Sequence, residues 1–226
     1  MGSQELTGGP GAGLPAEAGL HAAAVQESAW SGGGSPFAMG SKKLGMWLFI
    51  VSDAITFSAL IIAYSYVRVA SADWPLPFHF YPSVIKATVM TFVLLSSSVT
   101  MVMAVRAAKL DQRGTAAKWI GATALGGLTF IVLHAFEWAT LIEEGVRLFK
   151  NPWGSPLFGA AFFTLTGLHM THVAIGVIYL IIVAAAYGKG KLSSEDVEVS
   201  GLYWHFVDLV WMFIFPLVYL LSVKMG

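Results

Sequence analysis

The chain has 226 residues, of which 56% are hydrophobic and 12% are charged, and its formal net charge is zero. A soluble domain of this size cannot hide so much apolar surface, so lipid is expected to cover part of it. The zero net charge argues against a nucleic-acid partner, and the lack of cysteine excludes disulfides, iron–sulfur clusters, thiolate-bound copper and cysteine nucleophiles.

Residues 1–40 differ in composition from the rest of the chain. They are rich in Gly, Ala, Ser and Pro, and no apolar stretch among them is long enough for a signal-peptide core. This composition is typical of a flexible tail, with a short surface helix over residues 16–30 as the alternative. A membrane domain is expected over residues 41–226, with its first span acting as an uncleaved insertion signal.

Five apolar segments follow the tail, at residues 44–67, 84–105, 119–142, 157–187 and 202–223. About 20 helical residues, each rising about 1.5 Å, cross a hydrocarbon core of about 30 Å. The fourth segment is longer than this, so it is expected to tilt or to project from the bilayer. The predicted fold class is all-α: a polytopic membrane protein with a bundle of five transmembrane helices.

Four short stretches predict the loops between these segments. Prolines interrupt residues 74–77 and 151–156, where a helix cannot continue. Residues 111–114 contain Gly beside polar side chains, and residues 188–198 are polar. Each pair of consecutive segments is therefore expected to be antiparallel.

Lysine and arginine are distributed unevenly between the two ends of the predicted helices. One end carries eight of them: Lys42, Lys43, Arg106, Lys109, Arg113, Lys118, Lys189 and Lys191. The other end carries five: Arg68, Lys86, Arg147, Lys150 and Lys224. Because positive charge favours the cytoplasmic side, the N-terminus is predicted to be cytoplasmic and the C-terminus periplasmic.

Ionisable residues occur inside four of the five predicted spans. They are Asp53, His134, Glu137, His169, His172, His205 and Asp208. Asp53 lies roughly 14 Å from the start of its span, and Asp208 roughly 9 Å. The sequence therefore places Asp53, His205 and Asp208 in the inner half of the membrane, with Glu137 and His134 nearer the outer face. Whether they meet laterally is left open.

Charged groups in hydrocarbon are costly, so these residues need partners or a purpose. The predicted role of His134, His169 and His172 is to link helices by hydrogen bonds, of about 1 kcal/mol each, with contacts to lipid headgroups or other subunits as the alternative. A metal site at His169 and His172 would need further converging ligands. Asp53 has the stronger functional case, because a lone carboxylate at mid-depth must be protonated or paired.

Small residues and tryptophans in the spans are interpreted as structural. Glycines such as Gly121, Gly127 and Gly176 permit close approach of helices. Tryptophans at predicted span ends are expected to anchor at the membrane interface. These are Trp119, Trp138 and Trp204.

Four ordered motifs resemble subunit III of the haem–copper respiratory oxidases. The most specific is residues 203–208 (YWHFVD), followed by Val210 and Trp211. The others are residues 162–176, which include TGLH and His172, residues 44–53 (LGMWLFIVSD), and residues 127–138, which run from GLTF to Glu137 and Trp138. The resemblance covers about residues 42–224.

The chain departs from that family pattern at two positions and in its length. The family usually has glutamate where Asp53 stands, and that glutamate reacts with carbodiimide, so the shorter side chain puts the reactivity in doubt. It usually has glutamine at the position of His134. The long family members have seven spans, and this chain resembles the five-span bacterial form. The phospholipid cleft that the two extra helices make is expected to be open here or filled by a partner subunit.

The resemblance implies a non-catalytic subunit of a proton-translocating oxidase in the bacterial inner membrane. Haem and copper would be held by the partner subunits I and II, and this chain would bind no metal but would bind phospholipid. Asp53, Glu137 and Asp208 would be the buried acids related to proton supply. The helix-packing or lipid-binding residues would be His134, His169, His172, His205 and Trp211.

Two other functions are considered. The first alternative is a subunit of the same fold in a related assembly, such as a quinol oxidase or a nitric oxide reductase. A small ion transporter that uses the buried carboxylates as a relay is the remote alternative, which the lack of a repeated motif between the halves disfavours.

Overall fold

The computed structural model describes residues 40–224. The predicted tail at residues 1–40 therefore lies, apart from Gly40, outside the described residues. Contacts divide the chain into two units, Met1–Ser41 and Lys42–Gly226. The second unit contains the predicted spans, and the description below concerns that unit.

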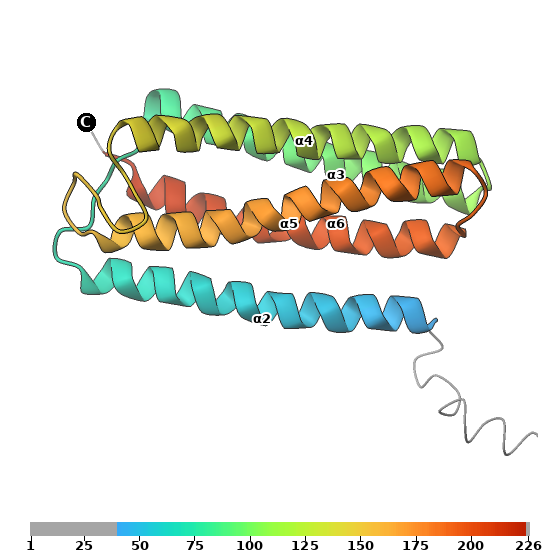
Figure 1. Cartoon of the computed structure of the whole chain (residues 1–226), viewed down its shortest axis with the longest axis horizontal. Coiled ribbons are helices and arrows are strands. Elements are labelled where there is room, and N and C mark those ends of the chain that lie inside the picture. The colour runs from blue at the N-terminus through green and yellow to red at the C-terminus, as the bar shows by residue number, and fades with distance from the viewer. Residues whose placement is uncertain (1–39, 225–226) are drawn as a thin grey trace, which may run out of the picture. The chain divides into compact units, whose positions relative to one another are not determined.

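Five long helices make up this unit: α2 (Ser41–Ala70), α3 (Ile85–Lys109), α4 (Arg113–Glu143), α5 (Leu157–Gly188) and α6 (Ser194–Ile214). Figure 1 shows them lying side by side along one direction. With the short turns that extend α3 and α6, all five are long and apolar enough to cross a membrane. The prediction of five long apolar helices is thereby confirmed. With their extensions they have 29 to 32 residues, so α5 is not much longer than the others, whereas the sequence had predicted it to be.

Four of the helices form a closed ring. Helix α4 packs on α3 and α5, and α6 packs on the same two helices. Helix α2 stands apart from the ring in Figure 1. Its buried residues Ile50, Phe57 and Tyr64 belong to the same hydrophobic core as the ring. Only 11% of its apolar window is buried, against 50% of that of α6. Helix α6 is therefore the centre of the packing, and α2 depends on a few specific contacts.

Helix α6 begins earlier than the sequence predicted. The backbone N–H of Ser193 donates to Asp196 Oδ2 at 2.8 Å, and the N–H of Asp196 donates back to Ser193 Oγ at 3.4 Å. This reciprocal pair satisfies N–H groups that would otherwise lack partners at the start of a helix. The polar segment expected to be a loop up to residue 198 is therefore helical from Ser194 onward.

The last span does not end as a regular α-helix. A π-helical turn follows at Phe215–Tyr219, and a 3-10 turn at Leu220–Ser222. Pro216 has no N–H to donate to the preceding turn, which explains why the α-helical pattern stops there. Arg68 of α2 donates to the backbone carbonyls of Leu217 and Leu221. The irregular end of this span is thus held by the end of α2.

Two tryptophans of α6 lie fully inside the bundle. Trp204 and Trp211 are both 0% exposed. The Trp204 indole N–H donates to Ser97 Oγ at 3.0 Å, and that of Trp211 donates to Thr91 Oγ1 at 2.9 Å, so both join α6 to α3. The prediction that Trp204 anchors at the membrane interface is wrong, because the earlier start of α6 moves it well into the helix.

Two of the three glycines named above lie where helices pack closely. A Cβ on Gly127 would collide with the ring of Trp204, and one on Gly176 would lie 3.0 Å from atoms of both Trp204 and Tyr203. Both therefore permit the close packing that was predicted. A Cβ on Gly121 would meet nothing within 4 Å, so this glycine permits no close approach between helices of the described chain.

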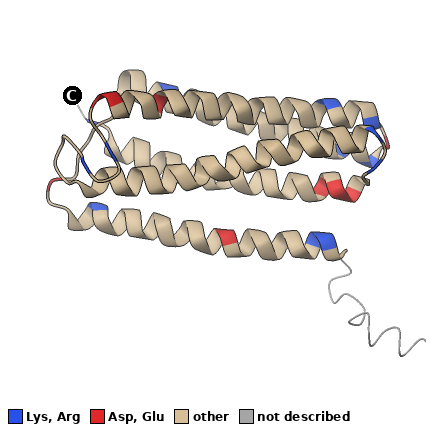
Figure 2. Ribbon diagram, in the orientation of Figure 1, with Lys and Arg blue, Asp and Glu red and all other residues tan. Residues whose placement is uncertain are grey.

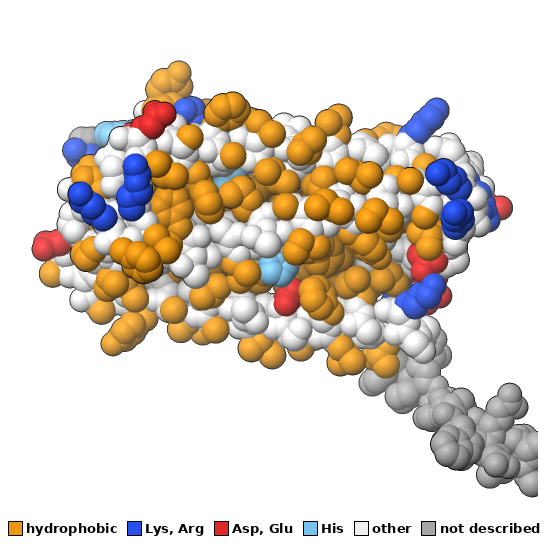
Figure 3. Space-filling view, in the orientation of Figure 1, with side chains coloured by type: hydrophobic (Ala, Val, Ile, Leu, Met, Phe, Trp, Pro, Cys, Tyr) orange, Lys and Arg blue, Asp and Glu red, His pale blue; other side chains and the backbone are white. Residues whose placement is uncertain are grey.

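The surface has the distribution expected of a chain surrounded by lipid. Figure 3 shows hydrophobic side chains along the length of the helices, with Lys and Arg gathered at the two ends. Large apolar residues such as Ile55, Ile62 and Phe136 are about two-thirds exposed, which water would disfavour and hydrocarbon would not. In Figure 2 a single acidic position interrupts the middle of α2; this is Asp53.

Candidate functional site

Asp53 of α2 is paired with His172 of α5. Asp53 Oδ2 lies 3.0 Å from His172 Nε2, and their side chains are 19% and 16% exposed. His172 Nδ1 lies 2.9 Å from the carbonyl oxygen of Leu168, which can only accept, so Nδ1 carries a hydrogen. Nε2 then either accepts from a protonated Asp53 or donates to its carboxylate. In both cases the pair shares one proton and is neutral overall, which suits a site within a membrane span.

Aromatic side chains surround this pair and fix α2 against α5 and α6. Phe57 is 3% exposed and packs edge-on against His172, with ring centroids 5.1 Å apart. It also contacts Phe206 of α6 at 6.3 Å. The hydroxyl of Tyr203 donates to the backbone carbonyl of His172 at 2.9 Å. The pair is therefore the polar centre of a region where α2 contacts both α5 and α6.

His134 of α4 and His169 of α5 meet at Trp211. Both imidazoles are 0% exposed. The His169 ring stacks on the Trp211 indole at 5.3 Å, and the His134 ring meets it edge-on at 5.5 Å. Neither imidazole has a hydrogen-bond partner among the described residues. The contacts that join these helices are thus ring packing, where the sequence predicted hydrogen bonds.

Glu137 lies one turn farther along α4 and has a partner that the sequence did not predict. It is 8% exposed, and the hydroxyl of Tyr219 donates to its Oε2 at 3.1 Å. His134 Nδ1 lies 4.0 Å from the same oxygen. Glu137 also lines a hollow of about 120 Å³ together with His79, Lys86 and Glu144. His134 and Glu137 therefore form the separate group that the sequence predicted, completed by Tyr219.

His205 and Asp208 of α6 face α3 and not Asp53. His205 Nδ1 lies 3.1 Å from Ser98 Oγ, and Asp208 is 7% exposed. Within residues 40–224, no hydrogen bond or ion pair joins Asp53 to His205 or Asp208, and the partner of Asp53 is His172. The contact with Ser98 was not predicted from the sequence.

Ion pairs join three helices at the end of the bundle where α6 begins. Lys42 Nζ lies 2.6 Å from Asp196 Oδ1, and Lys43 Nζ lies 2.7 Å from Glu198 Oε1. Lys109 Nζ lies 3.8 Å from the other oxygen of Glu198. These contacts confirm that the starts of α2 and α6 and the end of α3 share one end of the bundle, as the antiparallel prediction requires.

No metal centre is formed by the residues that the structure describes. Among residues 40–224, no three His, Asp or Glu side chains are grouped closely enough to hold a metal ion. The arrangement can join helices without placing net charge between them. In each span that has an ionisable residue, that residue or an aromatic ring beside it contacts a neighbouring span. The roles predicted for the individual residues in proton supply and lipid binding stay predictions.

Known proteins are similar to this chain over about four-fifths of its length. The profile of the family described as cytochrome c oxidase subunit III matches residues 20–223. A cytochrome c oxidase subunit 3 of Alkalihalophilus pseudofirmus is 32% identical, with 81% of this chain and 88% of the relative covered. A quinol oxidase subunit 3 of Bacillus spizizenii is 34% identical over 79% and 86%. A cytochrome bo(3) ubiquinol oxidase subunit 3 of Pseudomonas aeruginosa is 31% identical over 81% and 86%. The chain belongs to the cytochrome c oxidase subunit III family.

Proposed function

We propose that the chain is the non-catalytic subunit III of a bacterial haem–copper terminal oxidase, where it supports subunit I, binds phospholipid and sustains proton uptake during turnover. One observation carries the proposal: the family match spans all five helices. The paired groups Asp53–His172 and Glu137–Tyr219 agree with it, because they are engaged in joining helices.

The partners follow from this role. Subunit I would hold the haems and copper, and subunit II would stand beside it. The chain would be a multi-pass protein of the bacterial inner membrane, with its N-terminus in the cytoplasm. The bias of eight basic residues to five supports this orientation, and the bacterial relatives support the location.

A quinol oxidase is the second candidate complex. It is favoured by the relatives, because proteins named as cytochrome c oxidase and as quinol oxidase subunit 3 match this chain about equally well. The nature of subunit II distinguishes the two complexes. Copper ligands in that subunit would indicate cytochrome c as the electron donor, and their replacement would indicate quinol.

Purification through a tag on this chain tests the proposal. We expect subunits I and II to co-purify with it from mild detergent, and we expect the preparation to show the visible spectrum of haem. A subunit census by mass spectrometry, combined with metal analysis, gives the result. Recovery of the chain as a solitary monomer, with no haem-containing subunit in any mild detergent, would contradict the proposal.

A further inference from the structure

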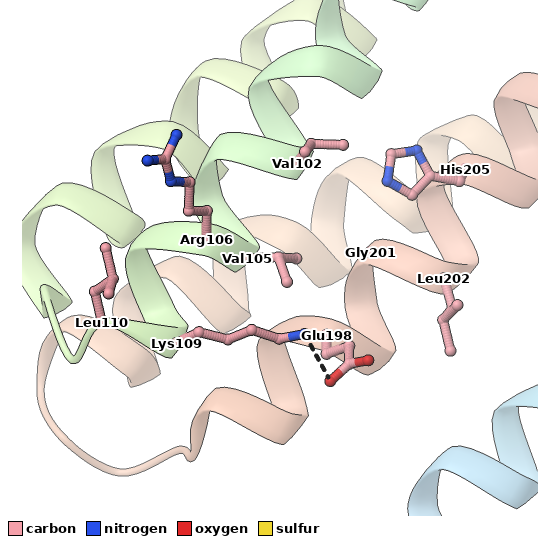
Figure 4. A pocket seen from close by; sticks show the side chains of 9 residues that line it. All are labelled: Val102, Val105, Arg106, Lys109, Leu110, Glu198, Gly201, Leu202 and His205. Atoms are coloured by element: carbon pink, nitrogen blue, oxygen red, sulfur yellow. Dashed lines mark ion pairs between the residues drawn. The ribbon is translucent and has the colours of Figure 1, made fainter.

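A hollow lies between α3 and α6, and its lining includes Lys109, Glu198 and His205, which take part in contacts described above. It has a volume of about 470 Å³, and Figure 4 shows the side chains that line it. Val102 and Val105 of α3 and Leu202 of α6 form its apolar part. Gly201 deepens the floor, because a Cβ there would lie 3.2 Å from Val105 Cγ2. The hollow is a groove in the part of the bundle that lipid is expected to surround.

Positive charge gathers at one end of this groove. Arg106 and Lys109 both line it and both project from α3, and in Figure 4 they lie toward the end of that helix, away from His205. Lys109 Nζ lies 3.8 Å from Glu198 Oε2, and Glu198 also binds Lys43 at the shorter distance of 2.7 Å. Arg106 is exposed and makes no ion pair or side-chain hydrogen bond within residues 40–224. The guanidinium of Arg106 therefore lines an apolar groove, and no acidic side chain among the described residues pairs with its charge.

This combination identifies the chemistry of the occupant. Val102 precedes Arg106 by about one turn of α3, or roughly 6 Å along the axis, so the apolar lining continues from the charge toward the membrane interior. A guanidinium binds a phosphate through two parallel N–H donors. Acyl chains fit the apolar lining, and an anionic headgroup fits the basic end. Neither a free anion nor an uncharged lipid matches both halves of the groove.

We infer that the groove between α3 and α6 binds one anionic phospholipid, with its headgroup phosphate on Arg106 and Lys109 and an acyl chain along Val102, Val105 and Leu202. The inference rests on the proposed role in phospholipid binding and assigns that role a place. The groove lies at the end of the bundle where α6 begins, and it is distinct from any cleft that additional helices would make.

Photolabelling of the purified oxidase complex tests this assignment. The probes are phosphatidylglycerol and phosphatidylcholine with the same diazirine-bearing acyl chain, each supplied in phosphatidylcholine nanodiscs that hold the complex. In the wild type we expect phosphatidylglycerol to label α3 and α6 peptides of the groove several-fold more than phosphatidylcholine. Each basic side chain near a lipid surface contributes roughly a fivefold change in binding, so Arg106→Gln and Lys109→Gln should each lower the labelling by about that factor.

Matched variants separate this site from general charge effects. Lys118→Gln with Lys189→Gln removes two exposed charges from the same end of the bundle but outside the groove, and should leave the labelling unchanged. Val102→Trp fills the apolar part without altering charge, at a side chain that is 54% exposed, and should lower the labelling. This variant keeps the test valid if the complex does not tolerate the changes at Arg106.

Three results would overturn the assignment. They are equal labelling by the two lipids, wild-type labelling in the Arg106→Gln/Lys109→Gln variant, and full displacement of phosphatidylglycerol by inorganic phosphate, which would indicate a site for a free anion. Co-purification of the haem-containing subunits is recorded in the same samples. If these subunits are present while labelling is unselective, the lipid site fails and the proposed function stands; if they are absent, the proposed function itself fails.

Discussion

Trp211→Ala is expected to lower the free energy of unfolding of the bundle by about 3–5 kcal/mol, the range for removing a large aromatic side chain from a core. Trp211 is 0% exposed and lies between His134 and His169. Its removal leaves a cavity where α3, α4, α5 and α6 meet and deprives Thr91 Oγ1 of its indole donor. Thermal or denaturant unfolding of the purified complex, followed through the loss of this chain, measures the change.

Trp119→Ala is the matched control for that prediction. Trp119 is 39% exposed at the start of the third span, so its replacement should change the free energy of unfolding by about 0.5 kcal/mol or less. Equal effects of the two substitutions would contradict the view that Trp211 is a main packing residue of the bundle.

Asp53→Ala is expected to cost about 1–3 kcal/mol of stability, because it leaves His172 Nε2 without a partner in a partly buried site. The oxidase should then lose activity faster during turnover, since α2 has few other contacts with the ring of four helices. Repeated assays of the purified complex give the inactivation rate, and unfolding gives the stability.

Asp53→Asn separates the structural role of this residue from a role in proton supply. With a hydrogen on His172 Nδ1, the Asn amide can donate to Nε2 and preserve the link between α2 and α5. We therefore expect Asn to restore most of the stability and of the enzyme lifetime lost in Asp53→Ala. If Asn restores the stability but the inactivation stays as fast as in Asp53→Ala, the carboxyl proton itself is required and the purely structural reading is wrong. His172→Ala combined with Asp53→Ala measures the coupling between the two residues directly.

The sequence was sufficient for the helices because each span is a long apolar run, and lipid leaves few alternatives for such a run. The prediction from the sequence failed at the start of α6, because the capping pair Ser193 and Asp196 lies in a polar stretch that is typical of a loop. The [ST]-x-x-[DE] pattern was present and could have found this start. The same error placed Trp204 at the membrane interface, although its indole lies in the core.

The sequence was sufficient to predict which residues belong to the candidate site, but not which side chains they contact. Spacing in a helix fixes which residues share a face, and Asp53 was expected to need a partner. Which helix supplies that partner depends on how the spans are arranged around one another, and a single sequence does not encode this visibly. His172 for Asp53, Ser98 for His205 and Tyr219 for Glu137 therefore emerged only from the structure.

The central claim is that this chain sustains an oxidase whose redox centres lie in other subunits. The most direct test compares the purified oxidase with and without this chain over many catalytic turnovers, recording both oxygen consumption and the proton-to-electron ratio. The account predicts that the complex lacking the chain starts with activity but inactivates faster and takes up protons less effectively. An unchanged inactivation rate together with an unchanged proton-to-electron ratio would contradict it.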